Sequence, residues 1–252
     1  MRVNLPDELV VALGAAASTD RLLVASDFDG TLAPIVNDPA SARALPRAAD
    51  ALVALADLPR TSVVLVSGRA LATLRELSAM PSTVHLVGSH GAEFDTGFAN
   101  PIDTELLQRI TTELTAIASG RPGVTVEPKP ASVALHVRNA NADDGAAALA
   151  AARTASESWA AEVTSGKAVL EFAVITTDKG EAVDALRVQT GATAVVFFGD
   201  DVTDEKAFRR MLDADVGVKV GPGDTLARYR IDDPEDVATA LNYLVEARRE
   251  YR

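Results

Sequence analysis

Two carboxylates stand directly behind an apolar run near the beginning of the chain. Asp27 and Asp29 follow residues 22–25, with the small residues Ser26 and Gly30 beside them. Because side chains alternate along an extended strand, the two acids are expected to share a face and converge on one point. Their small neighbours would let a ligand approach the backbone. This arrangement is typical of phosphoryl transfer, and a solvated acidic turn is the alternative explanation.

A second acidic segment closes the apolar run at 195–198. It carries four acids in six positions, which repel one another unless a cation or a helix N-terminus takes up the charge. Asp204 and Glu205 are expected to begin a helix with Thr203 as its N-cap. Asp200 has no such structural explanation, so the pattern predicts that Asp200 binds a metal ion.

Two further segments carry groups that suit phosphate oxygens. Ser67-Gly68-Arg69 follows a second apolar run, where a hydroxyl and backbone N–H groups at a helix start suit an anion. Lys179 opens a helical stretch later in the chain. Each segment alone is a weak signal, because Ser-Gly turns and surface lysines are common.

The elements that must position these groups alternate between strands and helices. Strands are expected at 22–26, 63–66 and 84–87, with helices at 47–56 and 71–77. Such alternation predicts βαβ units and a parallel sheet. In open parallel sheets ligands bind just beyond the carboxyl ends of the strands, which is where Asp27 and Asp29 stand.

The alternation is interrupted after residue 100 and resumes at Lys179. The interruption is expected to hold helices at 105–118 and 144–161 and strands at 124–127, 132–137 and 168–173. The resumed part is expected to hold helices to 189, at 204–212 and after Asp233, with strands at 195–198 and 216–220. The sequence therefore predicts an α/β fold: a Rossmann-like catalytic core at 1–100 and 177–252, with a smaller inserted α+β domain at 101–176.

Composition narrows the function classes. The 252 residues are 48% hydrophobic, contain no cysteine and carry a formal net charge of −12. The negative charge opposes binding to nucleic acid or anionic membrane, and no apolar run is long enough to span a bilayer. Asp7 and Glu8 interrupt the start where an export signal needs an apolar stretch, so a short surface helix and a cytoplasmic location are expected. Without thiolates, a hard cation such as Mg²⁺ fits best.

The four polar segments, taken in order, are far more specific than any one of them. The chain carries Asp-x-Asp-Gly-Thr at 27–31, Ser-Gly-Arg at 67–69, Lys-Gly at 179–180 and Gly-Asp-Asp-x-Thr-Asp at 199–204. In this order they resemble the motifs of the haloacid dehalogenase-like phosphatases. The insertion lies between the second and third motifs, where that superfamily has its C2-type cap domain.

Further segments narrow the resemblance to the trehalose-6-phosphate phosphatase family. They are Leu32-Ala33-Pro34-Ile35, Gly88-Ser89-His90-Gly91-Ala92-Glu93, Glu127-Pro128-Lys129, Ala134-Leu135-His136-Val137-Arg138 and Gly166-Lys167-Ala168-Val169-Leu170-Glu171. Val137, where an aromatic residue is frequent, and Phe172-Ala173 depart from the family pattern.

The resemblance implies a phosphoric monoester hydrolase that releases trehalose and inorganic phosphate from trehalose 6-phosphate, the last step of trehalose biosynthesis. Asp27 is implied as the nucleophile that forms an aspartyl-phosphate, Asp29 as the acid and base, and Lys179 as a third catalytic group. The implied phosphate-binding residues are Thr31, Ser67, Gly68 and Lys179. The implied Mg²⁺ ligands are Asp27, Asp29 through its backbone carbonyl, Asp200 and Asp204. The implied substrate-binding residues are Arg69, His90, Glu127, Lys129, His136, Arg138 and Glu171.

Alternation in the insertion supports a polar face independently of the resemblance. Glu127 with Lys129, His136 with Arg138, and Lys167 with Glu171 are each expected to share a strand face opposite the apolar residues. A sheet with one face in water is the structural alternative. The functional interpretation is a hydroxyl-rich substrate, for which mixed donors and acceptors are suited.

Rival functions remain open at this point. They include a sucrose-phosphate or a mannosyl- or glucosyl-phosphoglycerate phosphatase with the same core, a phosphomutase, and a non-catalytic sugar-phosphate sensor. The expected partner is a small sugar phosphate, with no nucleic acid and no membrane, and a monomer is expected.

Overall fold

The chain folds into two compact units. The computed structural model describes residues 5–98, 100–175 and 177–251. Met1–Gly97 together with Thr177–Arg252 form the first unit, here called the core unit, and Phe98–Thr176 form the inserted unit. The sequence places the domain boundaries after residues 100 and 176. Residues 99 and 176 lie outside the described residues, so these boundaries stay predictions.

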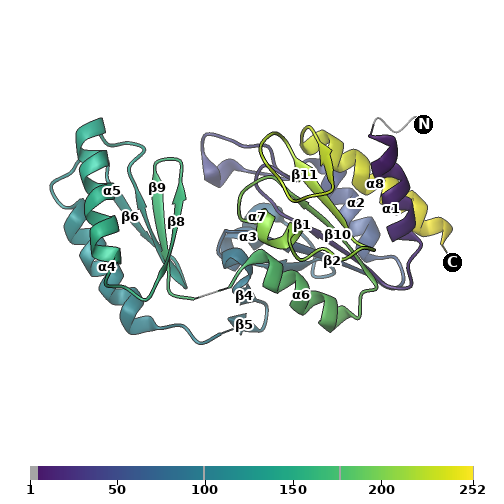
Figure 1. Cartoon of the computed structure of the whole chain (residues 1–252), viewed down its shortest axis with the longest axis horizontal. Helices are drawn as coiled ribbons and strands as arrows, with labels where there is room; N and C mark the ends of the chain where they lie inside the picture. Colours follow the sequence, from purple (N-terminus) through teal and green to yellow (C-terminus); the bar gives the residue numbers. More distant parts are fainter. Residues whose placement is uncertain (1–4, 99, 176, 252) are drawn as a thin grey trace. The chain divides into compact units, whose positions relative to one another are not determined.

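Six parallel strands form the sheet of the core unit (Figure 1). Their order is β12 (Tyr229–Ile231), β11 (Val216–Val220), β10 (Ala194–Gly199), β1 (Leu22–Ser26), β2 (Thr61–Val66) and β3 (His85–Val87). The two central strands, β1 and β10, are buried along their whole length, which explains their continuous apolar sequences. The strand order reverses between them, and this is the position where parallel sheets bind ligands. The short edge strand β12 was not predicted.

Helices cover both faces of this sheet. The core-unit helices are α1 (Asp7–Ala17), α2 (Pro46–Ala56), α3 (Leu71–Ser78), α6 (Lys179–Thr190), α7 (Asp204–Phe208) and α8 (Pro234–Glu250). Helices α1, α2, α3 and α8 share one apolar core with the sheet, and α6 and α7 share the other. Helix α8 begins as predicted, because the Asp233 side chain accepts hydrogen bonds from the backbone N–H groups of Glu235 and Asp236. Over the described residues, none of the helices has the combination of length and apolar sequence that a bilayer crossing requires.

Short elements complete the core unit. They are the 3₁₀ turns η1 (Pro39–Ser41) and η2 (Ser89–Gly91) and the strand pair β4 (Glu93–Phe94) and β5 (Gly97–Phe98), of which Phe98 already belongs to the inserted unit. These short elements were not predicted from the sequence. His85, expected inside an apolar strand, begins β3 and is exposed.

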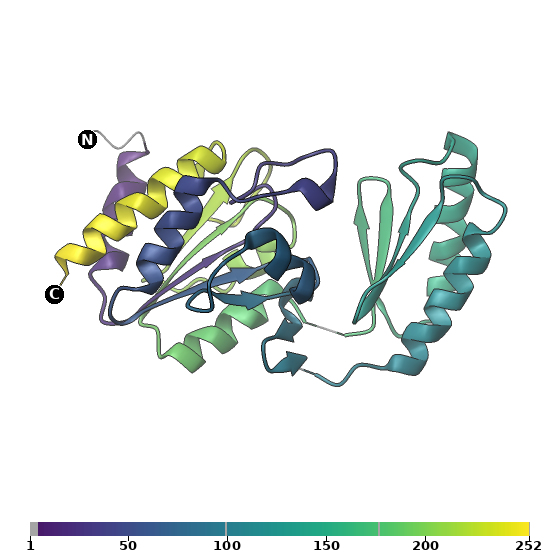
Figure 2. The ribbon, with the colours of Figure 1, turned by 180° about the vertical axis from the view of Figure 1, so that it is seen from behind.

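The inserted unit is a four-stranded antiparallel sheet with two helices on one face (Figure 2). The sheet order is β6 (Thr125–Pro128), β7 (Ser132–His136), β9 (Val169–Ala173) and β8 (Glu162–Gly166), and the helices are α4 (Thr104–Ala118) and α5 (Ala142–Ser156). Strands β7 and β9 bury one face against the helices, through residues that include Val133, Leu135, Leu170 and Phe172.

One prediction for the inserted unit is wrong. The second helix ends at Ser156 rather than at residue 161, and β8 is a strand that the sequence did not reveal. The hydroxyl groups of Ser156 and Ser158 donate to the carbonyl oxygens of Arg153 and Ala155, which competes with the helical pattern. The chain then turns so that the Trp159 ring packs edge-on against Phe172, with 5.0 Å between ring centroids. Alanine content alone therefore overestimated the helix.

Candidate active site

The predicted catalytic segments meet at the carboxyl ends of β1 and β10. Strand β1 ends at Ser26, and the Asp27 amide still donates to the Phe198 carbonyl of β10, at 2.9 Å. Gly30 then turns the chain with a φ of +80°, which residues with a Cβ rarely adopt. A Cβ at Gly30 would lie 2.1 Å from Oδ2 of Asp200, so the two acidic segments can approach each other only because residue 30 is glycine.

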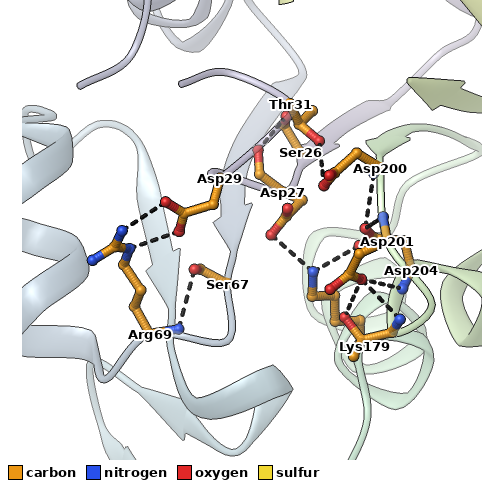
Figure 3. Close-up of polar contacts among 11 residues, drawn as sticks. Ser26, Asp27, Asp29, Thr31, Ser67, Arg69, Lys179, Asp200, Asp201 and Asp204 are labelled. Carbon is orange, nitrogen blue, oxygen red and sulfur yellow. Dashed lines mark hydrogen bonds and ion pairs between the residues drawn. The ribbon is translucent and has the colours of Figure 1, made fainter. Parts of the chain in front are cut away.

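Lys179 is the central cation of the site (Figure 3). Its Nζ lies 2.8 Å from Oδ1 of Asp27 and 2.7 Å from Oδ1 of Asp204, and the residue is only 2% exposed. The explanation of Lys179 as an ordinary surface lysine is therefore excluded. A lysine is buried this deeply only when it is paired, and here two carboxylates from separate segments pair with it.

Asp204 also organises the acidic loop after β10. Its Oδ2 accepts the backbone N–H groups of Asp200 and Asp201, each at 3.0 Å. Thr203 occupies the N-cap position of α7, as predicted. The Thr203 side chain makes no capping hydrogen bond, and Asp201 accepts from the Thr203 amide at 2.8 Å and from its hydroxyl at 2.6 Å. Helix α7 is shorter than predicted.

Three carboxylates form a group that fits a cation. One oxygen each from Asp27, Asp200 and Asp204 lie within 4.8 Å of one another. The Thr31 hydroxyl donates to Oδ1 of Asp200 at 3.4 Å, and Thr31 is completely buried. The donor atoms are hard oxygens, and the negative charge of the three carboxylates exceeds the positive charge of Lys179. This donor set is compatible with a metal ion.

Burial, together with repulsion among the carboxylates, raises the pKa values of three acids of the site. Burial raises the pKa of Asp27 to about 7, although Lys179 acts in the opposite direction. Burial likewise raises the pKa of Asp204 to about 8 and that of Asp200 to about 6. Burial also acts against the Lys179 ammonium, but the attraction of Asp204 and Asp27 outweighs it and raises the pKa of Lys179. A bound divalent cation would lower the carboxyl pKa values by offsetting the same repulsion.

Asp29 does not converge with Asp27, contrary to the prediction from strand alternation. Its carboxylate receives two hydrogen bonds of 2.6 Å from the Arg69 guanidinium, and Figure 3 shows it directed away from Lys179. The reason is that β1 ends at Ser26, so the two-residue alternation no longer holds at residues 27–29. The Asp29 side chain is therefore not part of the three-carboxylate group, and the predicted role of the Asp29 backbone carbonyl as a metal ligand stays a prediction.

The segment after β2 supplies Ser67, Gly68 and Arg69. Ser67 is 1% exposed, and its Oγ accepts a hydrogen bond of 3.2 Å from the Arg69 amide. Arg69, predicted to bind substrate, also donates to the Pro39 carbonyl at 2.9 Å. The His90 ring lies against Gly68, where a Cβ would come within 2.4 Å of its Cε1. The structure thus brings Arg69 and Asp29 together and places His90 beside the Ser67 segment.

Four of the predicted substrate residues of the inserted unit form two hydrogen-bonded pairs on one face of its sheet. Glu127 and Glu171 both lie opposite Ala134 in neighbouring strands, so they share a face. His136 Nε2 lies 2.8 Å from Oε2 of Glu127, and Lys129 Nζ donates to Oε2 of Glu171 at 3.0 Å. Two residues depart from the predicted pattern: Arg138 lies exposed in a turn after β7, and Lys167 lies in the turn between β8 and β9.

Lys219 belongs to the site but was not predicted from the sequence. This residue is 4% exposed on β11, and its Nζ donates to the backbone carbonyl of Asp200. It therefore fixes the loop that carries Asp200. A lysine inside an apolar run, as in Val216-Gly217-Val218-Lys219-Val220, was the available signal.

Comparisons with known proteins agree with the motifs. The family pattern described as trehalose-phosphatase matches residues 25–235. A trehalose-phosphate phosphatase of Mycobacterium avium is 36% identical over 238 residues, which cover 88% of this chain and 58% of that protein. One from Mycobacterium bovis is 35% identical and covers 98% of this chain and 67% of the relative. The chain thus spans about three fifths to two thirds of the length of these relatives.

Solved structures resemble the fold over nearly the whole chain. The C-terminal domain of Candida albicans trehalose-6-phosphate phosphatase superposes with a TM-score of 0.81 at 24% identity, covering 98% of this chain and 99% of that one. Trehalose-6-phosphate phosphatase of Aspergillus fumigatus gives a TM-score of 0.67 at 27% identity, covering 94% and 97%. These likenesses confirm the predicted fold class, a parallel-sheet α/β core with a smaller α+β insertion.

Proposed function

The chain belongs to the trehalose-phosphatase family, and from this premise we propose that it hydrolyses trehalose 6-phosphate to trehalose and inorganic phosphate. The observation that supports this proposal most is the buried Lys179, which joins Asp27 to Asp204 beside Asp200. A phosphatase needs this combination of a nucleophilic oxygen, a fixed cation and a metal-binding group of carboxylates.

Asp27 is the proposed nucleophile. Its carboxylate attacks phosphorus, the sugar oxygen leaves, and water then cleaves the aspartyl-phosphate, so that one difficult hydrolysis becomes two easier steps. Lys179 holds one Asp27 oxygen at 2.8 Å and is a fixed positive charge for the phosphoryl oxygens. Asp204 fixes Lys179 from the other side and is proposed to act mainly through it.

Asp29 is the proposed acid and base. It gives a proton to the departing sugar oxygen and then takes one from the attacking water. Arg69 fixes the Asp29 carboxylate with two hydrogen bonds, so this role requires Asp29 to exchange at least one of them for the substrate. Ser67 and Thr31, both buried at the strand ends, are proposed to bind phosphoryl oxygens, with Gly68 giving them room.

Mg²⁺ is the proposed cofactor, held by Asp27, Asp200 and the backbone carbonyl of Asp29, with Asp204 nearby. When bound it offsets the repulsion between the Asp27 carboxylate and the negatively charged phosphate. The fit rests on three hard oxygen donors within 4.8 Å and on the raised carboxyl pKa values.

Mg²⁺ binding is expected to release protons and to tighten as pH rises. Protons compete with the cation for Asp200 and Asp27, whose pKa values are about 6 and about 7. We therefore expect Mg²⁺ affinity to rise by at least about tenfold from pH 6 to pH 8. Calorimetric titration in two buffers of different ionisation enthalpy measures both effects. Equal affinities at both pH values, with no proton released, would contradict the assignment of Asp27 and Asp200 as Mg²⁺ ligands. Asp200→Asn is the matched control and is expected to lose Mg²⁺ binding.

The polar face of the inserted unit is proposed to bind the sugar. Lys129, Glu171 and Ser132 already form a hydrogen-bonded chain there, and Glu127 pairs with His136. These groups offer both donors and acceptors, as a disaccharide with many hydroxyl groups requires. Arg138 and His90 are proposed as further substrate contacts.

Lys129→Ala is expected to separate sugar recognition from phosphate chemistry. A hydrogen bond from a charged group contributes about 1.5–3 kcal/mol, so kcat/KM for trehalose 6-phosphate should fall roughly 10- to 150-fold. Turnover of an aryl phosphate, which lacks the sugar, should stay within about threefold. Arg109→Ala on α4 is the matched control, because Arg109 is an exposed cation of the same unit on its helical side. Equal losses on both substrates would count against the sugar-binding role.

The proposed reaction is tested by Mg²⁺-dependent phosphate release from a panel of substrates. Trehalose 6-phosphate should be preferred over glucose 6-phosphate, sucrose 6-phosphate and mannosyl phosphoglycerate, with equimolar trehalose and phosphate as products. Preference for another member would assign the chain to that substrate. Isomerised phosphosugar without free phosphate would indicate a mutase, and tight binding without turnover would indicate a sensor.

A further inference from the structure

Residues 88–93 adopt an unusual backbone beside the proposed phosphate-binding groups. Ser89 and His90, neither of them glycine, have φ angles of +51° and +56°, and Gly91 follows at +106°. Consecutive residues with a Cβ seldom occupy this left-handed region. Such conformations persist only where surrounding contacts over-determine them, and they cluster at functional sites.

Those contacts run first to the segment that carries Ser67. The Ser89 amide donates to the Arg69 carbonyl at 2.7 Å, and the His90 amide donates to the Ser67 carbonyl at 2.9 Å. Glu93 completes the connection, because its Oε2 accepts the Leu71 amide at 2.8 Å and the Ser89 hydroxyl at 3.2 Å. The positive-φ turn is therefore attached to both ends of the Ser67–Arg69 backbone.

The same segment touches the start of α6, which carries Lys179. A Cβ on Gly91 would lie 2.7 Å from the backbone carbonyl oxygen of Asp178 and 3.0 Å from the Cβ of Ala182. Asp178 immediately precedes Lys179, and its carbonyl also accepts the Ala182 amide at 3.1 Å. Residues 88–93 thus contact both segments that are proposed to hold the phosphoryl group.

We propose that residues 88–93 are a strut that sets the spacing between Ser67 and Lys179, with Gly91 and Glu93 as its positioning residues. This inference rests on the proposed function, since it assigns those two groups to the phosphoryl oxygens. Gly91 permits the close approach to α6, and Glu93 ties the strut to the first amide of α3. Neither residue is assigned a contact with the substrate. Both act by placing groups that are.

Gly91→Ala and Gly97→Ala form a matched pair that tests the α6 side. Both glycines have nearly the same positive φ, +106° and +109°, but nothing lies within 4 Å of a Cβ at Gly97. Both variants place a Cβ at a positive φ, but only Gly91→Ala adds a clash with the start of α6, so it should lose more thermal stability and should alone move Lys179. We expect its affinity for inorganic phosphate, by calorimetry with Mg²⁺, to fall at least tenfold, and Gly97→Ala to stay within twofold. Equal phosphate affinity in folded Gly91→Ala and wild type would overturn the strut.

Glu93→Ala tests, by hydrogen exchange and without need of turnover, whether the strut connects the Ser67 side to the α6 side. We expect faster exchange of the amides of Leu71 and Ala182, with Glu93→Gln restoring protection because its amide oxygen still accepts a hydrogen bond. Exchange that changes only at residues 88–93 would overturn the proposal. If the wild type hydrolyses no sugar phosphate, the proposed function fails, and the exchange at Leu71 and Ala182 still decides whether the strut exists.

Discussion

Asp27→Asn is expected to lower the turnover of trehalose 6-phosphate by at least about 10⁴-fold, as removal of a catalytic nucleophile does in other hydrolases. The amide is nearly isosteric with the carboxylate, and its oxygen can still accept the Lys179 hydrogen bond found at 2.8 Å. The fold should therefore survive while the oxygen that attacks phosphorus loses its charge. Phosphate release and thermal unfolding, measured on the same preparation, separate the two effects.

Two controls keep this result interpretable. Asp50→Asn removes one exposed carboxylate from α2 and should leave turnover unchanged. Asp27→Ala guards against slow deamidation, which would regenerate the wild-type residue from asparagine. If Asp27→Ala retains wild-type turnover, Asp27 is not the nucleophile.

Lys179→Met is expected to reduce both activity and stability. Methionine keeps the volume of the lysine stem but leaves the carboxylates of Asp27 and Asp204 buried without their cation. Breaking a buried ion pair in this way costs about 3–5 kcal/mol of unfolding free energy. Loss of the charge that stabilises the phosphoryl oxygens should lower kcat about 10²- to 10³-fold.

The loss of stability in Lys179→Met should be larger at pH 8 than at pH 5. The folded pKa values of Asp27 and Asp204, about 7 and about 8, lie above the ordinary value of 3.8. The folded protein therefore binds protons at these two carboxylates more tightly than the unfolded chain does. As the pH rises from the unfolded pKa of 3.8 to the folded values, the contribution of these groups to the free energy of unfolding falls. Without Lys179 the carboxylates lose the cation that limits this fall. Urea unfolding of both proteins in EDTA, at pH 5 and at pH 8, measures the loss of unfolding free energy in Lys179→Met. A loss of the same size at both pH values would contradict the electrostatic role of Lys179.

The sequence predicted the core of the fold well, because β1 and β10 are buried on both faces and read as continuous apolar runs. The start of α8 was equally clear, since Asp233 and Pro234 determine it locally. Strand β8 was missed, because its polar, largely exposed residues carry no apolar pattern and only pairing with β9 makes it a strand. Such tertiary pairing overrides local propensity.

The site could be predicted as a set of residues but not as a set of contacts. The order of motifs brought Asp27, Lys179, Asp200 and Asp204 together correctly in one group. Neither the pairing of Asp29 with Arg69 nor the contact of Lys219 with Asp200 follows from spacing. Both depend on how the chain turns beyond a strand end, where the alternation of side chains stops applying.

The proposed mechanism depends most on Asp27 forming a bond to phosphorus, and trapping that bond tests the mechanism most directly. The wild-type protein is mixed with trehalose 6-phosphate and Mg²⁺, quenched in acid within one turnover, digested and examined by mass spectrometry. We expect one phosphoryl group on the peptide that contains Asp27, located on that residue and absent from Asp27→Asn. A phosphoryl group on another residue, or its presence in Asp27→Asn, would contradict the proposed mechanism.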